Sequence, residues 1–181
     1  PETIDTAWFA IREWLAPRIL GRTLAGPEDV QPLLDADLRG HNMAKAAVEM
    51  GVWELAARLK SLPLARLLGG TRERVAVGIS LGIQKDPAAL VERAQAALAQ
   101  GYRKVKIKIK PGADVEYVGA VREAVGPEPH LMADANSAYT LADADHLARL
   151  DAFDLMMIEQ PLDREDLVRH ARLQQRLRTP I

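Results

Sequence analysis

The sequence predicts an α/β protein with a parallel sheet, equivalent to the first half of a (β/α)8-type barrel and preceded by a helical region. Two observations carry this prediction. Short apolar segments occur four times between residues 75 and 159, at intervals of about 25 to 30 residues, which is the size of a βαβ unit. Each is followed by a helical pattern rather than a hairpin turn, and strands separated by helices pair in parallel.

The first part of the chain carries apolar residues at helical spacing and no strand pattern. We expect helices over residues 4–20, 27–38, 41–60 and 63–68. Pro27 suits the first turn of its helix, and Gly69-Gly70 ends the last one. The predicted domain boundary therefore separates a helical domain, residues 1–70, from a partial barrel, residues 71–181.

The second part alternates between the two element types. We expect strands over residues 75–81, 103–110, 130–134 and 154–159, and helices over 86–100, 114–125, 140–150 and 163–177. Asp86-Pro87 forms an N-cap and first-turn pair, and Thr140 with Asp143 forms a capping box. Residues 179–181 resemble the opening of a fifth strand. These elements give four βα units and the start of strand five.

Composition argues against several classes of protein. The 181 residues have a formal net charge of −1 and only 4% aromatic residues, which disfavours a nucleic-acid partner. There is no cysteine, so disulfides and thiolate metal sites are excluded. No apolar run approaches the roughly 20 residues of a membrane span. We expect a cytoplasmic protein with neither a membrane nor a nucleic acid as partner.

The strand at residues 103–110 alternates strictly between lysines and β-branched residues. Its four lysines, Lys104, Lys106, Lys108 and Lys110, share one face. On an open antiparallel edge they would be solvated, but both faces of a parallel sheet are covered. Buried unpaired ammonium groups are costly, so we expect some of these lysines to serve a function.

Functional residues of barrels stand at the carboxyl ends of the strands. Candidates of this kind occur on all four strands: Ser80, Lys106, Lys108, Asp134, Asn136 and Glu159. Neighbouring strands lie about 5 Å apart, so Asp134 and Glu159 can share a hard cation while Lys108 lies one strand away. Such a set suits abstraction of a proton α to a carboxylate, and oxygen ligands favour Mg²⁺ or Mn²⁺ over zinc. A lysine base is neutral only if burial and nearby positive charge lower its pKa.

Three segments resemble one family: Lys-Ile-Lys-Ile-Lys-Pro-Gly at 106–112, Asp-Ala-Asn-Ser-Ala-Tyr at 134–139 and Ile-Glu-Gln-Pro-Leu at 158–162. They are similar to the muconate-lactonizing subgroup of the enolase superfamily, and most similar to its o-succinylbenzoate synthase / N-acylamino acid racemase family. The resemblance implies that residues 1–70 are the helical part of an α+β capping domain. It also implies a small carboxylate substrate, a divalent metal (Mg²⁺ favoured, Mn²⁺ or Co²⁺ as alternatives) and a homo-oligomer.

The same resemblance assigns roles to the candidate residues. Lys108 would be the base on one face of the substrate, and Lys106 would tune it and help neutralise the enolate. Asp134 and Glu159 would be metal ligands. Two further positions complete the set: Asn136 would support the metal or the substrate carboxylate, and Ser80 would line the substrate pocket.

Several alternatives stay open at this point. The reaction could be the dehydration that forms o-succinylbenzoate in menaquinone synthesis, or racemisation of N-acylamino acids. A dipeptide epimerase, a muconate cycloisomerase-like enzyme and a non-catalytic barrel fragment are further possibilities. The family's third acidic metal ligand and second lysine would lie after Ile181. We therefore expect a chain truncated at both ends and inactive alone.

Overall fold

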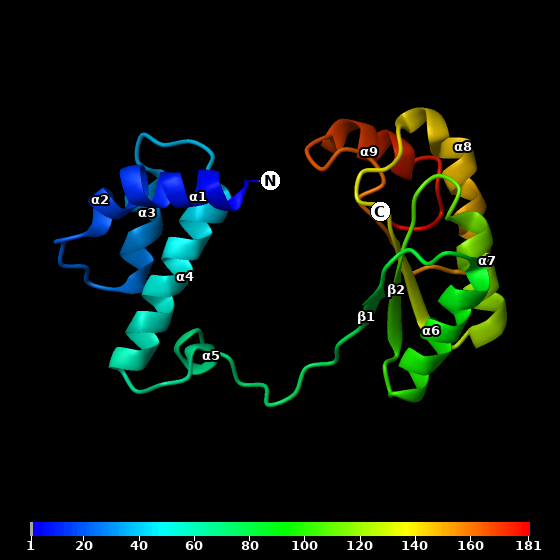
Figure 1. Cartoon of the computed structure of the whole chain (residues 1–181), viewed down its shortest axis with the longest axis horizontal. Coiled ribbons are helices and arrows are strands. Elements are labelled where there is room, and N and C mark those ends of the chain that lie inside the picture. The colour runs from blue at the N-terminus through cyan, green and yellow to red at the C-terminus, as the bar shows by residue number, and fades with distance from the viewer. Residues whose placement is uncertain (1) are drawn as a thin grey trace. The chain divides into compact units, whose positions relative to one another are not determined.

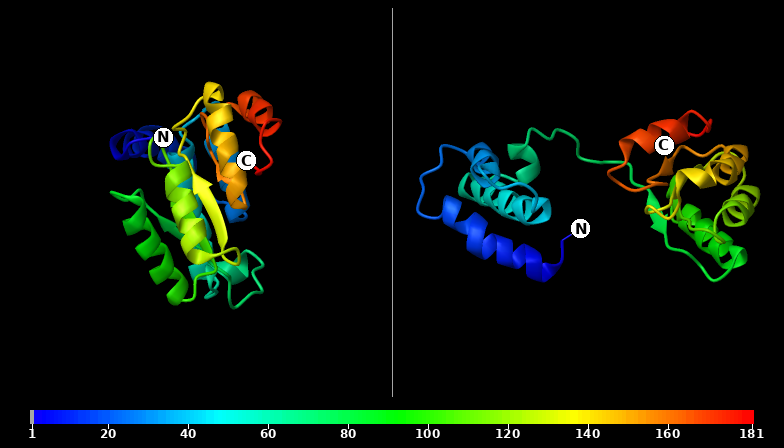
Figure 2. Two further views of the ribbon diagram at one scale, coloured as in Figure 1. Left: turned by 90° about the vertical axis from the view of Figure 1, so that its right-hand side faces the viewer. Right: turned by 90° about the horizontal axis from the view of Figure 1, so that it is seen from above.

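The computed structural model describes residues 2–181 and divides them into two compact units (Figures 1 and 2). One unit ends at Arg74 and the other spans Val75–Ile181, so the division falls shortly after the predicted boundary at residue 70. Each unit has its own cluster of buried apolar side chains. Among the described residues, no helix combines the length and the apolar character needed to cross a membrane.

The first unit is helical, as expected. Its elements are α1 (Ile4–Ala10), η1 (Ile11–Leu15), α2 (Ala16–Ile19), η2 (Pro27–Asp29), α3 (Val30–Asp35), α4 (Asn42–Leu59) and α5 (Leu64–Leu67). The single helix predicted over 4–20 contains a π turn, η1, just before Pro17. Proline lacks the N–H that would bond the carbonyl four residues earlier, and a wider turn accommodates that loss.

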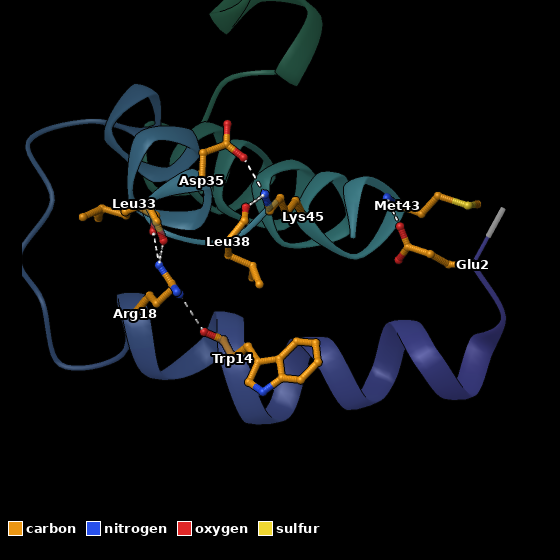
Figure 3. Close-up of polar contacts among 9 residues, drawn as sticks. Glu2, Trp14, Arg18, Leu33, Asp35, Leu38, Met43 and Lys45 are labelled. Atoms are coloured by element: carbon orange, nitrogen blue, oxygen red, sulfur yellow. Dashed lines mark hydrogen bonds and ion pairs between the residues drawn. The ribbon is translucent and has the colours of Figure 1, made fainter. Parts of the chain in front are cut away.

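Polar side chains hold the loop between α3 and α4 (Figure 3). The Lys45 ammonium donates to Asp35 Oδ1 at 2.7 Å and to the Leu38 carbonyl at 2.5 Å. His41 precedes α4 in the left-handed region and gives it no side-chain cap. The Glu2 carboxylate takes that place, because it accepts from the backbone N–H groups at the start of α4, including that of Met43 at 2.8 Å.

The second unit is a four-stranded parallel sheet whose strand order follows the chain: β1 (Ile79–Leu81), β2 (Lys104–Lys108), β3 (His130–Asp134) and β4 (Ile158–Glu159). The connecting helical elements are α6 (Pro87–Ala99), α7 (Val115–Val125), η3 (Leu141–Asp143), α8 (Ala144–Leu147) and η4 (Ala148–Phe153), and α9 (Leu167–Gln174) follows β4. The α/β class, the parallel pairing and the four βα units are confirmed.

One face of the sheet packs against the helices, and the other carries the lysines. Val105, Ile107, Leu131, Ala133 and Ile158 are fully buried in the cluster that includes α6 and α7 side chains. Figure 1 shows α6, α7 and α8 together on one side of the strands. The period of two therefore assigns the apolar residues of β2 to the core and its lysines to the opposite face.

Two predicted caps are present. The Asp86 carboxylate accepts from the Ala89 N–H at 2.7 Å at the start of α6. The Thr140–Asp143 capping box opens a run of short helical turns, η3, α8 and η4, in place of one regular helix. The capping residues therefore mark where these helical segments begin, although the segment after Thr140 is not one regular helix.

Three predicted elements are too long. The strand at 75–81 is limited to Ile79–Leu81, because Ile79 pairs with Val105 near the start of β2 and earlier residues have almost no partner strand. The strand at 154–159 is limited to β4. The helix predicted from 163 begins at Leu167, because Asp166 caps it by accepting from the Arg169 N–H at 2.9 Å.

The last residues run beside β4. The Ile158 N–H donates to the Pro180 carbonyl at 2.8 Å, as expected if residues 179–181 open a further strand. Asp151 holds this segment, since its carboxylate accepts from the Arg178 N–H at 2.9 Å and the Thr179 N–H at 2.8 Å. The end of the described chain is therefore anchored to the sheet.

The Arg122 guanidinium joins the loops at the amino ends of β3 and β4. It donates to five carbonyls, those of Gly126 (2.8 Å), Pro127 (3.3 Å), Pro129 (3.0 Å), Phe153 (2.9 Å) and Asp154 (3.1 Å). One side chain on α7 thus satisfies backbone acceptors from two separate loops, which water would otherwise have to reach.

We predict that Arg122→Met lowers the free energy of unfolding of the second unit by about 3 kcal/mol, because several acceptors lose a charged donor. Urea titration of the 181-residue chain measures this change. Arg93→Met, which removes an exposed arginine from α6, is the matched control and should cost less than about 0.5 kcal/mol. Equal effects of the two substitutions would contradict the role of Arg122 in joining the two loops.

Candidate active site

The register of the sheet brings the main candidates to one level. Lys108 pairs with Asp134, and Asp134 pairs with Glu159, across three neighbouring strands. Ser80 on β1 pairs with Lys106 on β2, two residues nearer the amino end of β2 than Lys108. Residues that pair in register share a face of the sheet, so all five side chains belong to the lysine face.

Two ammonium groups and two carboxylates meet on this face. Lys106 Nζ lies 2.7 Å from Glu159 Oε2 and 3.2 Å from Asp134 Oδ2. Lys108 Nζ lies 3.0 Å from the same Asp134 Oδ2. The Asp134 side chain is only 1% exposed, so its charge is balanced by these two partners rather than by water. We call these four residues the charge cluster.

Asn136 joins the charge cluster from the loop after β3. Its backbone N–H donates to Asp134 Oδ1 at 3.1 Å, and its side-chain carbonyl accepts from Lys108 Nζ. The Asn136 backbone lies in the left-handed region with φ of 44°, a conformation that asparagine tolerates better than most residues. This turn directs the amide toward Lys108.

The cluster shifts the ionisation of its members. Burial raises the pKa of Asp134, but hydrogen bonds from Lys108 and Lys106 outweigh it, and the pKa lies below its ordinary value. The hydrogen bond with Glu159 raises the pKa of Lys106, against the opposing effect of burial, to above its ordinary value. Asp134 is therefore an anion and Lys106 a cation at neutral pH.

The remaining candidates lie outside this network. Ser80 is exposed on β1, and no hydrogen bond among residues 2–181 joins it to the charge cluster. Lys104 lies on the same face, at the amino end of β2, and Lys110 is exposed beyond the strand. Of the lysines on this strand, Lys106 and Lys108 thus reach the carboxylates.

The donor chemistry of the cluster fits a hard divalent cation. Asp134 and Glu159 offer carboxylate oxygens from paired positions, and the Lys106 ammonium already bridges them. Within the described part of the chain, no group of three or more His, Cys, Asp or Glu residues could hold a metal. Two carboxylates suffice for Mg²⁺, which keeps several of its water ligands.

Sequence reasoning missed a second polar group beside the site. Asp114 was expected only to begin a helix, yet its Oδ2 accepts from the Tyr139 hydroxyl and from His146 Nε2, each at 2.8 Å. The pattern that could have indicated it is an aspartate placed after one strand and a tyrosine placed after the next. No spacing rule brings His146 to them, because its position depends on how α8 packs.

Comparison with known proteins places the chain in a family. Residues 89–181 match the family described as enolase C-terminal domain-like. Residues 3–69 match the N-terminal domain of mandelate racemase / muconate lactonizing enzyme. The chain belongs to the enolase superfamily. The family resemblance drawn from the three sequence segments is thereby confirmed, and this superfamily consists of enzymes.

Individual relatives agree with this assignment. The chain is 51% identical over 180 residues to an o-succinylbenzoate synthase of Geobacillus kaustophilus and 50% identical over 183 residues to an N-succinylamino acid racemase of Thermus thermophilus. Each match covers 99% of this chain and 48% of the relative. A solved superfamily member from Listeria innocua, 43% identical, superposes with a TM-score of 0.92 over 98% of this chain and 47% of its own. The chain spans about half the length of these relatives.

We predict that Asp134→Asn lowers the free energy of unfolding of the metal-free chain by about 2 kcal/mol at pH 7, because two ammonium groups lose a buried counter-charge. The folded-state pKa of Asp134 is depressed, so its stabilisation is present above the unfolded pKa of about 3.9 and is lost as pH falls through the folded pKa.

Urea titrations at pH 7 and at successively lower pH, with chelator present, measure this effect. The difference between the parent chain and Asp134→Asn should shrink on acidification. Asp145→Asn serves as the control, because the Asp145 side chain is 91% exposed and surface ion pairs contribute little to stability. A difference that is independent of pH would contradict the assigned ionisation of Asp134.

Proposed function

We propose that this chain supplies the proton-abstracting part of an enzyme that removes a proton α to a carboxylate, acting as an o-succinylbenzoate synthase, an N-acylamino acid racemase, or both. The observation that carries the proposal is the charge cluster, in which two lysines face two carboxylates at the carboxyl ends of parallel strands. Site residues in barrels of this kind stand at that end.

Lys108 is the proposed base. A lysine acts as a general base only in its neutral form. The Lys108 amine lies 3.0 Å from Asp134 Oδ2 at the carboxyl end of the neighbouring strand. Lys106 contacts the same Asp134 oxygen as Lys108, so both amines would lie beside a cation held by that carboxylate. Asn136 holds the Lys108 amine through its side-chain carbonyl.

The other residues handle the charge of substrate and product. Asp134 and Glu159 would hold a divalent cation, with Mg²⁺ favoured and Mn²⁺ or Co²⁺ as alternatives. When bound, the cation supplies positive charge where the enolate oxygens become negative. Lys106 adds a second positive charge beside that position. Ser80, exposed on β1, would line the pocket for the rest of the substrate.

We keep both reactions in the proposal, because the relatives named for them are about equally similar to this chain, at 51% and 50% identity. Dehydration requires one base, whereas racemisation requires a base on each face of the substrate. A hydrophobic dipeptide epimerase of Enterococcus faecalis is 34% identical over 158 residues, which makes dipeptide epimerisation the weaker proposal. We further propose a small carboxylate as substrate, a homo-oligomeric assembly and a cytoplasmic location for the whole protein.

A chimaera tests the reaction directly. Residues 2–181 replace the matched segment of the Geobacillus kaustophilus relative, which supplies the remaining half of its length. We expect turnover of the o-succinylbenzoate precursor, of an N-succinylamino acid, or of both. Lys108→Met in the chimaera should lower kcat by about a thousandfold or more, because general-base catalysis is lost.

The matched control is Lys104→Met, which removes a lysine from the same face of the same strand without touching the carboxylates. It should leave kcat within about twofold. Failure of a folded chimaera to turn over either substrate would contradict the proposed function. Retention of rate by Lys108→Met would remove that residue from the base role.

We predict that a chelator abolishes turnover of the chimaera and that Mg²⁺ restores it. Glu159→Gln should raise the Mg²⁺ concentration needed for half-maximal rate by about tenfold or more, because one anionic ligand becomes neutral. Binding titration with Mg²⁺ alone gives the same comparison without substrate. An unchanged metal requirement in Glu159→Gln would rule out its role as a ligand.

A further inference from the structure

The loop after β3, residues 135–139, is bound along one side to the end of β4. The Ala135 N–H donates to the Glu159 carbonyl at 3.0 Å, and the Ser137 N–H donates to the Gln160 carbonyl at 2.8 Å. The Tyr139 N–H then donates to the Pro161 carbonyl at 3.0 Å. The pairing of β3 with β4 thus continues through the loop that carries Asn136.

The backbone of this loop is strained. Asn136 and Ser137 have φ of 44° and 65°, and Gln160 opposite them has φ of 47°. Residues other than glycine rarely occupy the left-handed region, and they stay there only when surrounding contacts over-determine the conformation. The β4 contacts restrain the backbone of the loop, and an anchor on the side chain of its last residue would add to that restraint.

Asp114 is placed to be that anchor. It follows the turn that closes after β2 and is buried at the start of α7, where its Oδ1 accepts from the Val115 N–H at 2.6 Å. Its Oδ2 accepts from the hydroxyl of Tyr139, the last residue of the loop, and from His146 Nε2 on α8. One carboxylate therefore joins the segment after β2, the loop after β3 and the helix behind them.

The direction of these hydrogen bonds is fixed by charge. Burial raises the pKa of Asp114, but hydrogen bonds from His146, the Val115 N–H and Tyr139 outweigh it, and the pKa lies below the ordinary value. Burial and the neighbouring carboxylate raise the pKa of Tyr139. The carboxylate is therefore ionised and the phenol protonated, so Tyr139 donates and Asp114 accepts. Hydrogen bonds to an ionised acceptor are the stronger kind.

We propose that Asp114, Tyr139 and His146 are positioning residues that hold the 135–139 loop in its strained conformation and thereby keep Asn136 in contact with Lys108. The inference rests on the proposed function in that Lys108 is the base whose geometry is being set. None of the three residues bonds to the charge cluster directly. They act through the loop, whose first residues follow Asp134 in the chain.

The anchor can be tested without turnover in the 181-residue chain. Asp114→Asn and Tyr139→Phe should accelerate hydrogen exchange of the Ser137 and Tyr139 backbone amides about tenfold or more, since each removes a hydrogen bond to a buried charge. The NMR signal of the Asn136 side-chain amide should shift in both variants. Asparagine caps helices as well as aspartate does, so a purely capping role of Asp114 predicts no change in the loop.

Three further variants complete the comparison. Tyr117→Phe removes an exposed hydroxyl that donates to the Lys85 carbonyl elsewhere in the same unit, and it should leave the loop unchanged. His146→Ala should accelerate exchange as Tyr139→Phe does, whereas His146→Gln keeps a terminal N–H donor and should restore at least part of the protection. Rescue of this kind is not expected if His146 only fills space.

The chimaera links the anchor to the reaction. Tyr139→Phe should lower kcat about tenfold while KM stays within about twofold, because the base is misplaced but the substrate pocket remains. The proposal would be overturned if Tyr139→Phe had the same loop hydrogen exchange and the same Asn136 side-chain signal as Tyr117→Phe. It would also be overturned if Tyr139→Phe accelerated exchange in the loop but left kcat unchanged. Absence of turnover in the parent chimaera would contradict the proposed function, whereas faster exchange would still support the anchor.

Discussion

The parallel register of β2, β3 and β4 is the constraint on which the site depends. It is fixed from the helix-facing side, where Ile107, Ala133 and Ile158 pair across the three strands and are fully buried. A slip of one residue would turn charged side chains into that core, because the side-chain period is two. Apolar packing on one face therefore sets the level at which Lys108, Asp134 and Glu159 meet on the other.

The charge cluster is balanced by its own members, with two ammonium groups against two carboxylates. This balance explains how Asp134 can be buried at the end of a strand without an orphaned charge, which would be costly there. Lys106 and Lys108 thus have a structural task as well as the chemical one proposed for them. The same side chains that neutralise the site also belong to the sheet that forms it.

The sequence was sufficient for the fold class and for the grouping of the charge cluster, because strict alternation and strand-end position are local properties that the parallel sheet preserves. It was insufficient where the ends of an element depend on contacts with other parts of the chain. The strand expected from Val75 begins at Ile79, since a strand needs a neighbour to bond. The helix expected from Asp163 begins after Asp166, because Asp163 instead accepts from the Glu165 N–H in a tight turn.

The contacts of Asp114 with Tyr139 and His146 belong to this second class. Each of the three residues has an ordinary local explanation: a helix cap, part of a strand-end motif and a surface position on a short helix. Only the packing of α7 and α8 against the loop after β3 brings them together. Such groups are invisible to spacing rules, because the distances between them are set by how separate elements dock.

Each strand of the second unit after β1 pairs with the strand that precedes it in the chain, and the segment at Pro180 continues that order beside β4. Each strand after β1 therefore has a partner in the described sheet that is synthesised before it. As the chain leaves the ribosome, each new βα unit finds its template already in place, and loop closure spans about one unit at a time. Strand order equal to synthesis order is the arrangement that allows a sheet to assemble in the direction of synthesis.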